Sequence, residues 1–375
     1  MTLRTSLAIL ACMGSAACGA ETASAPPAPP PPGSSATAAA SAPPAEAPAP
    51  APKPSMADMQ KATLASLLAA FNGHDAKKLG DAYAQDAVLA EPAPEGMKET
   101  KGREAIVSMH DGLFKHVPDV AIAPSRVFHI GDVLVVEWVG SGSDGAKKTS
   151  FQGAMALTFD QGGLIKADHT YMDSATIAMQ LGHAPGKPRP LATPPSGAPQ
   201  TVVASGSDDE KKTAETLRAN WPASWPKKDL KAFETSITDD AVHSDLGFPA
   251  DAVGKKANVA ELQMFAKSVP DMQVELTSVW AAGNVAIAEF VFSGTQKGPI
   301  GALKATGKKF TVHGLDVDEF KDGKLAKATT YDNAVEFLTQ LGFMPPEGAA
   351  GAPKPAAAPK AAAPAPKADK APKTK

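Results

Sequence analysis

The chain has 375 residues, a formal net charge of −3 at pH 7 and a pI near 6.3. A nearly neutral chain has no electrostatic attraction for nucleic acid, so no nucleic-acid partner is expected. The length fits two domains. The 35 prolines are concentrated, together with alanine, near both ends, and this shift in composition separates two tails from the region that folds.

The first 18 residues have the order of an export signal. Arg4 precedes a short apolar run at 6–13, and small residues at 15–17 lead to Cys18. The apolar run is too short to span a bilayer as a permanent helix. The arrangement resembles a bacterial lipoprotein signal, which implies cleavage before Cys18 and lipidation of that cysteine.

This resemblance implies a lipid-anchored protein of the cell envelope. Gly19, which is not aspartate, implies sorting to the outer membrane by default, and the anchored protein is expected at the outer membrane or facing the periplasm. The alternatives are lipidation at Cys12 and a plain secretory signal. Both cysteines of the chain lie in this segment, so neither a disulfide nor a thiol nucleophile is expected in the folded region.

Three further segments are rich in proline and small residues. Residues 19–55 are expected to form a disordered Pro/Ala tether, and residues 346–375 a disordered Pro/Ala/Lys tail, since neither can bury enough apolar surface to fold. Residues 184–207 are expected to be a flexible linker between two domains, at 56–183 and 208–345.

The two predicted domains are repeats of one another. Short signatures recur in the same order, which indicates duplication: DAV at 86–88 and 240–242, VPD at 117–119 and 269–271, and QLG at 180–182 and 340–342.

Each repeat is predicted to place helices before strands. Leu64, Leu67, Leu68 and Phe71 have the spacing of one helix face. Further helices are predicted near 79–83 and 106–113, and their counterparts near 230–237 and 259–265. Alternating patterns then predict strands at 120–128, 133–139, 152–159 and 164–173. This order predicts an α+β fold: two repeated domains, each a curved antiparallel sheet with about three to four helices on one face.

The strand at 133–139 is mostly apolar on both of its faces. Val133, Val135 and Glu137 share one face, and Leu134 and Trp138 share the other. Helices on one side do not account for the second apolar face. It is therefore expected to pack on the other repeat, as an intramolecular pseudo-dimer, or on a second molecule, as a homodimer through the sheet faces.

The second repeat resembles the SnoaL-like polyketide cyclase family, within the larger nuclear-transport-factor-like cone fold. The stretches that carry the resemblance are GTQKGP at 294–299, TGK at 306–308, GLDV at 314–317, DGKL at 322–325 and QLG at 340–342. It implies a curved sheet wrapped by helices around an apolar pocket. Some members close polyketide ester rings by aldol chemistry with an aspartate as acid and base, and many others only bind ligands.

The two repeats depart from the family pattern differently. The first is nine residues shorter where the second has its glycine-rich loop, yet it has Asp173 where the family has its last-strand aspartate. The second has the loop, but Gln296 stands where the family usually has histidine, and Asn333 takes the place of the aspartate.

Three residues of the first repeat form the candidate catalytic group. His169, Tyr171 and Asp173 alternate along one strand face. A carboxylate, an imidazole and a phenol together can remove a proton next to a carbonyl and stabilise the enolate. The alternative is an ordinary polar face, in which Asp173 is the N-cap of the last helix.

Seven further residues are candidate ligand-binding residues. Glu137 and Glu289 occupy equivalent places inside apolar strands, where each is a pocket acid or pairs across the sheet. Asp316 and Asp318 share a face, either in a pocket or in solvent. The complete set is Glu137, Trp138, Glu289, Phe290, Asp316, Asp318 and Tyr331.

Three functional hypotheses follow. The first is a binding protein for a small apolar or amphipathic molecule. The second is an acid/base enzyme, an ester cyclase, isomerase or dehydratase that uses Asp173, and the third is a structural or protein-interaction module. No metal site and no cofactor are expected, because the histidines lack paired ligand spacing and the chain has no phosphate loop or nucleotide fingerprint.

Overall fold

The computed structural model describes residues 53–182 and 186–344. The predicted export signal with Cys18, nearly all of the predicted tether and all of the predicted tail lie outside the described residues. Within the described residues, no helix is both long enough and apolar enough to cross a membrane.

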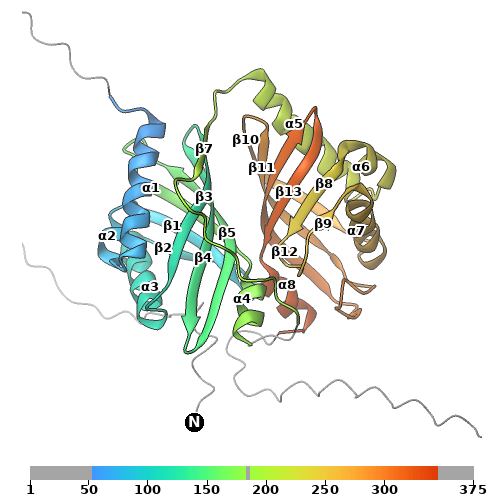
Figure 1. Cartoon of the computed structure of the whole chain (residues 1–375), viewed down its shortest axis with the longest axis horizontal. Helices are drawn as coiled ribbons and strands as arrows, with labels where there is room; N and C mark the ends of the chain where they lie inside the picture. The colour runs from blue at the N-terminus through green and yellow to red at the C-terminus, as the bar shows by residue number, and fades with distance from the viewer. Residues whose placement is uncertain (1–52, 183–185, 345–375) are drawn as a thin grey trace, which may run out of the picture.

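The first domain places three helices outside one sheet (Figure 1). Helix α1 begins with a capping box in which Ser55 and Asp58 satisfy each other's backbone N–H groups. A helix predicted near 79–83 lies earlier, at α2, and Tyr83 begins a strand instead. The helices are α1 (Met56–Asn72), α2 (Ala76–Gly80), α3 (Arg103–His116) and, after the sheet, α4 (Ser174–Leu181).

The sheet of the first domain has the strand order β2-β1-β6-β5-β4-β3-β7. The four strands predicted from alternation are present as β3 to β6. The strands are β1 (Tyr83–Ala93), β2 (Gly96–Lys101), β3 (Ala121–Ile130), β4 (Val133–Asp144), β5 (Lys147–Phe159), β6 (Ile165–Met172) and β7 (Gln200–Val203).

The second domain repeats this plan with the strand order β10-β11-β12-β13-β8-β9. Its helices are α5 (Asp208–Ser224), α6 (Leu230–Ser236), α7 (Lys255–Ser268) and α8 (Ala334–Leu341). Its strands are β8 (Ile237–Asp245), β9 (Ala252–Val253), β10 (Gln273–Ala282), β11 (Val285–Thr295), β12 (Lys309–Lys321) and β13 (Lys324–Asp332).

The α+β prediction with two repeated domains is confirmed, but the sheets are mixed rather than antiparallel. Strand β1 runs parallel to β6, and β8 runs parallel to β13. Each of these first strands follows a short helix and was not predicted. In β1 the residues Asp86 and Pro92, both poor strand formers, obscured the pattern.

The segment expected to be a flexible linker is packed against both domains. Strand β7 extends the first sheet by pairing in parallel with β3. The Ser150 hydroxyl donates to the Ala192 carbonyl over 2.7 Å, and Arg189 Nη1 pairs with Asp251 Oδ1 at 2.8 Å. The composition of this segment predicted flexibility because composition reflects only the conformational preferences of each residue. In the folded chain, strand pairing, a hydrogen bond and an ion pair to the two domains order the segment.

The two sheets face each other in the centre of the molecule, with α1–α3 and α5–α7 on the outside (Figure 1). The apolar face of 133–139 that the helices leave uncovered therefore packs on the other repeat. The buried residues of this shared layer are Phe128, Val133, Val135, Ala154, Ala156 and Tyr171 of the first domain and Leu246, Ala282, Val285, Ile287, Leu315, Val317 and Tyr331 of the second.

Two reciprocal tyrosine–glutamate pairs cross this layer. The Tyr331 hydroxyl donates to Glu137 Oε1 over 2.7 Å, and the Tyr171 hydroxyl donates to Glu289 Oε1 over 3.1 Å. The residues are equivalent in the two repeats, so the interface has the self-complementary form of a two-fold dimer.

Each of these buried glutamates also has a cationic partner. Arg126 forms an ion pair with Glu137 from the neighbouring strand and reaches across to Glu319 of the second domain. His169 Nδ1 lies 2.7 Å from Glu289 Oε1. A buried carboxylate is stable only with such partners, so the interface depends on the tyrosine hydrogen bonds and the cationic partners together.

We expect Tyr331→Phe to lower the free energy of unfolding by about 1–3 kcal/mol, because Glu137 then loses a buried hydrogen bond. Tyr171→Phe is the matched variant at the equivalent position. Urea denaturation at neutral pH measures both. A loss below about 0.5 kcal/mol in both variants would contradict a supporting role for the reciprocal pairs.

The His169–Glu289 pair predicts a pH dependence. Hydrogen bonding to Glu289 raises the pKa of His169, although burial opposes it. Burial alone would raise the pKa of Glu289, but its hydrogen bond from His169 lowers it. A raised histidine pKa stabilises the fold fully below about pH 6.5, and this stabilisation is lost as the pH rises through the folded-state pKa.

Urea denaturation of the wild type and of His169→Gln should therefore differ most near pH 5.5 and least near pH 8.5. Glu289 stays ionised at the lower value because its own pKa is depressed. The side chain of His169 is 43% exposed, so solvent screens the effect. If the stability difference between the two proteins grew with pH, the His169–Glu289 pair would not be its cause.

Candidate functional site

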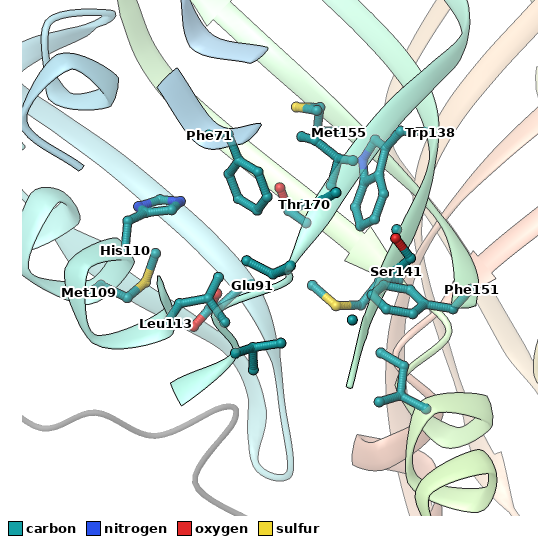
Figure 2. Close-up of a pocket in the computed structure, with 18 of the residues that line it drawn as sticks. Phe71, Glu91, Met109, His110, Leu113, Trp138, Ser141, Phe151, Met155 and Thr170 are labelled. Atoms are coloured by element: carbon teal, nitrogen blue, oxygen red, sulfur yellow. The ribbon is translucent and has the colours of Figure 1, made fainter. Parts of the chain in front are cut away.

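A cavity of about 170 Å³ lies in the first domain, between the helices and the sheet face that they cover. Figure 2 shows side chains from both layers pointing into it. Its walls are mainly apolar. Phe71 of α1 and Met109 and Leu113 of α3 line one side, and Trp138 of β4 and Met155 of β5 line the other.

Helix and strand spacing place these side chains together. Leu67 and Phe71 are four residues apart on α1, as are Met109 and Leu113 on α3. On the sheet, a Cβ atom at Gly153 would lie 2.3 Å from Cζ2 of Trp138. Glycine at this position therefore lets the indole lie over β5 at the edge of the cavity.

A buried carboxyl group forms one polar end of the cavity. Asp168 Oδ2 accepts a hydrogen bond from the Tyr83 hydroxyl over 2.7 Å, and Asp168 Oδ1 accepts one from the Thr170 hydroxyl over 2.9 Å. Burial raises the pKa of Asp168, and the two hydrogen bonds oppose that shift only in part. Burial also raises the pKa of Tyr83, which therefore stays a proton donor.

A second carboxyl group lines the same cavity. Burial raises the pKa of Glu91 to about 7, with Lys98 opposing the shift and the charge of Asp168 adding to it. Near neutral pH Glu91 therefore exists in both protonation states. A carboxyl group of this kind can accept or donate a proton under physiological conditions.

Two further residues that line the cavity carry polar groups, Trp138 and His110. Trp138 is 5% exposed, and its Nε1–H has no hydrogen-bond partner among the described residues. His110 Nδ1 lies 2.9 Å from the Ile106 carbonyl, so Nδ1 carries the proton and Nε2 is an acceptor. Burial lowers the pKa of His110, which keeps the ring neutral.

The predicted catalytic group is not assembled at this cavity. His169 and Tyr171 lie on the opposite face of β6, where they bind Glu289 of the second domain. Asp173 accepts a hydrogen bond from the Thr176 N–H over 2.9 Å, as N-cap of α4. Its pKa is raised to about 6 by burial. Strand periodicity grouped the first two residues correctly, but it cannot tell which face the helices cover.

The predicted ligand-binding residues are divided among three places. Trp138 lines the cavity of the first domain, whereas Glu137, Glu289 and Tyr331 lie in the layer between the sheets. In the second domain, Phe290 packs on Trp221 with ring centroids 5.1 Å apart. Asp316 and Asp318 line a small cavity there and are not solvent-exposed.

Sequence reasoning missed four residues of the first cavity. Tyr83 and Glu91 lie on β1, which was not predicted, and His110 is one of the histidines that were considered only as metal ligands and lack paired ligand spacing. The sequence did contain a pattern that could have identified Asp168. Asp168 alternates with Thr170 and Met172 on β6, on the face opposite His169, and all three line the cavity.

The second domain fills the corresponding space with its own side chains. Phe265 stands at the position of Leu113, and its ring lies 5.9 Å from that of Phe292. Ile300, from the loop that only the second repeat has, packs into the same cluster together with Phe310. The cavity that remains has about 40 Å³.

Gln296, the departure from the family pattern, holds this loop together. Its side chain is fully buried, its Oε1 accepts from the Thr306 hydroxyl over 2.8 Å, and its Nε2 donates to the Lys304 carbonyl over 3.1 Å. Gln296 therefore has a structural role in the closed second domain.

Comparison with protein families gives two matches. Residues 64–167 match the family described as "SnoaL-like domain", and residues 215–341 match the family described as "SnoaL-like polyketide cyclase". A search among curated proteins finds no match to the chain.

Solved structures with a similar fold each cover about the length of one domain. TsrD from Streptomyces laurentii is 24% identical, with 37% of this chain and 100% of its own covered and a TM-score of 0.34. A putative SnoaL-like polyketide cyclase from Jannaschia sp. CCS1 is 16% identical, with 37% and 97% covered and a TM-score of 0.35. An LEH-like epoxide hydrolase from M. tuberculosis is 15% identical, with 36% and 92% covered and a TM-score of 0.30.

We expect Gly153→Ala to lower the free energy of unfolding by about 1–3 kcal/mol and to displace the Trp138 indole, since the new methyl group overlaps it. Gly314→Ala is the matched variant, because a Cβ there would lie 2.3 Å from Cζ of Phe290. Urea denaturation measures the loss in both. The indole N–H resonance of Trp138 should shift only in Gly153→Ala, and an unchanged resonance would contradict the assigned contact.

Proposed function

We propose that this chain, which carries two SnoaL-like domains in tandem, binds a small, mostly apolar molecule in the cavity of its first domain. The observation that carries the proposal is the unpartnered Nε1–H of Trp138 beside an apolar cavity of about 170 Å³. Buried donors are nearly always hydrogen-bonded in folded proteins, so this indole is suited to bind an acceptor on a ligand.

The size and charge of the cavity define the ligand class. Engineered apolar cavities of about 150 Å³ bind benzene, so the first domain accommodates a molecule of about one six-membered ring with a small substituent. Burial raises the pKa of Asp168 and of Glu91 by disfavouring their charged forms, and the same burial disfavours a negative charge on the ligand. A neutral cyclic carbonyl compound therefore fits, with its oxygen accepting from Trp138.

Cyclohexanone and methylcyclohexane are suitable probes, because they match in shape and differ in the acceptor. Full-length protein should bind both by calorimetry and prefer the ketone. Trp138→Phe should abolish that preference while apolar binding persists. Loss of both ligands would point to a collapsed cavity, and an unchanged preference would contradict the role of Trp138.

Filling the cavity tests its location. Leu113→Trp should weaken binding of cyclohexanone at least tenfold, because the larger side chain occupies the ligand's space. Phe265→Trp makes the corresponding change in the second domain and should leave binding intact. Equal effects of the two variants would show that the ligand does not lie in the first domain.

A second candidate function is acid/base catalysis in the same cavity. Two carboxyl groups with raised pKa values, Asp168 and Glu91, line it near the Trp138 donor. An ionised carboxylate there can remove a proton next to a ketone carbonyl, and the indole N–H can stabilise the enolate oxygen. Reprotonation at the same carbon returns the ketone and regenerates the ionised carboxylate.

Hydrogen exchange separates this candidate from binding alone. In D₂O the wild type should exchange the α-hydrogens of cyclohexanone, detected by NMR, and Asp168→Asn should lose exchange while still binding. Asp173→Asn is the comparison variant for the group predicted from the sequence. Binding without any exchange in the wild type would support the binding function alone.

Export and lipid anchoring remain proposals. They are supported by the order of basic, apolar and small residues before Cys18. Cys18→Ala should yield an unprocessed, unlipidated form by mass spectrometry that leaves the membrane fraction. Unchanged mass and fractionation would contradict the anchor.

A further inference from the structure

The small cavity of the second domain contains a buried carboxylate without a hydrogen-bond partner. Asp318 of β12 is fully buried, and neither of its carboxylate oxygens has a partner of normal geometry among the described residues. The indole N–H of Trp221 lies near enough to the carboxylate to lower the pKa of Asp318. Leu157 occupies the equivalent position in the first domain, so this acid is specific to the second.

Other acids surround Asp318. Asp316, on the same face of β12, accepts a hydrogen bond from the Thr330 hydroxyl over 2.5 Å. His243 of β8 also lines the cavity, but its Nδ1 lies 2.7 Å from Glu261 of α7. Burial opposes the charged ring, but the charge of Glu261 raises the pKa of His243 to about 10, and the charge of His243 in turn lowers the pKa of Asp316 and of Asp318.

Charges of both signs act on this group of acids. Burial raises the pKa of Asp245 of β8 to about 6 against the charges of His243 and Arg189, and Asp245 in turn raises the pKa of Asp316. Among the described residues that line the cavity, none is lysine or arginine. Burial raises the pKa of Asp318 to about 7, although the charge of His243 opposes the shift.

The remaining walls are aromatic. Trp221 of α5 and Trp225, which follows this helix, lie with their rings 6.5 Å apart and line the cavity together with Phe233 and Phe320. Aromatic faces attract organic cations, most strongly when both are removed from water. The cavity therefore combines an unpaired carboxylate with the surface that best accepts an alkylammonium ion.

We propose that the second domain binds a small primary ammonium ion, with its charge on Asp318 and Asp316 and its alkyl carbon against Trp221. A cavity needs about 10–15 Å³ to hold one water molecule, so about 40 Å³ admits methylammonium or the end of a slim primary amine. The three N–H donors of an ammonium group match the free acceptors of the two aspartates.

A hard metal ion fits this site less well. Calcium and magnesium take six or more oxygen ligands, whereas aromatic rings form much of this wall. The described residues contain no group of three or more acidic, histidine or cysteine side chains that could hold a metal ion.

Methylammonium chloride is the probe, with potassium chloride at equal concentration as the ionic control. Calorimetry and thermal unfolding of the full chain should show saturable binding of methylammonium only. Asp318→Asn should weaken binding at least tenfold, while Asp322→Asn, which removes the same charge from an exposed turn, should leave it unchanged.

A second measurement locates the ion. Methyl protons of bound methylammonium should give nuclear Overhauser effects to the Trp221 indole, and Trp221→Leu should weaken binding even if Asp318→Asn does not fold. Equal stabilisation by potassium, or full affinity in Trp221→Leu, would overturn the proposal. Because the site is separate from the first cavity, loss of cyclohexanone binding would leave this result unaffected.

Discussion

The structure depends on burying one glutamate from each sheet between the two domains. Glu137 and Glu289 lie inside apolar strands, and an isolated carboxylate at such a place would be strongly destabilising. Each receives a tyrosine hydroxyl from the opposite domain, and Arg126 or His169 supplies positive charge. Neither domain supplies all of the hydrogen bonds that its own glutamate needs. These polar contacts therefore determine how the apolar faces of the two domains align.

This pairing determines which sheet faces are available for ligands. The faces that meet between the domains are committed to the shared apolar layer, and the helix-covered faces enclose the two cavities described above. The same strand periodicity then places alternate residues in different chemical settings. On β6, Asp168 lies in the cavity of the first domain, while its neighbour His169 lies at the interface.

Duplication allowed the two interiors to diverge on one scaffold. The first retains a cavity because Leu113 is small enough and the β4–β5 turn is short. In the second, Phe265 and the loop held by Gln296 fill the equivalent space. The buried acids also lie at different places, with Asp168 on β6 in the first domain and Asp316 and Asp318 on β12 in the second.

The sequence alone determined the properties that depend on local pattern. Recurring short signatures indicated the duplication, and helix and strand periodicity predicted the α+β class and the two apolar faces of β4, because alternation is a property of neighbouring residues. Tertiary structure decided which face holds a cavity, how the sheets pair and that β7 is ordered, because each depends on contacts between distant residues. Asp173 shows the difference: its spacing suited both an acid and an N-cap, and its hydrogen bond to Thr176 in the folded chain makes it a cap.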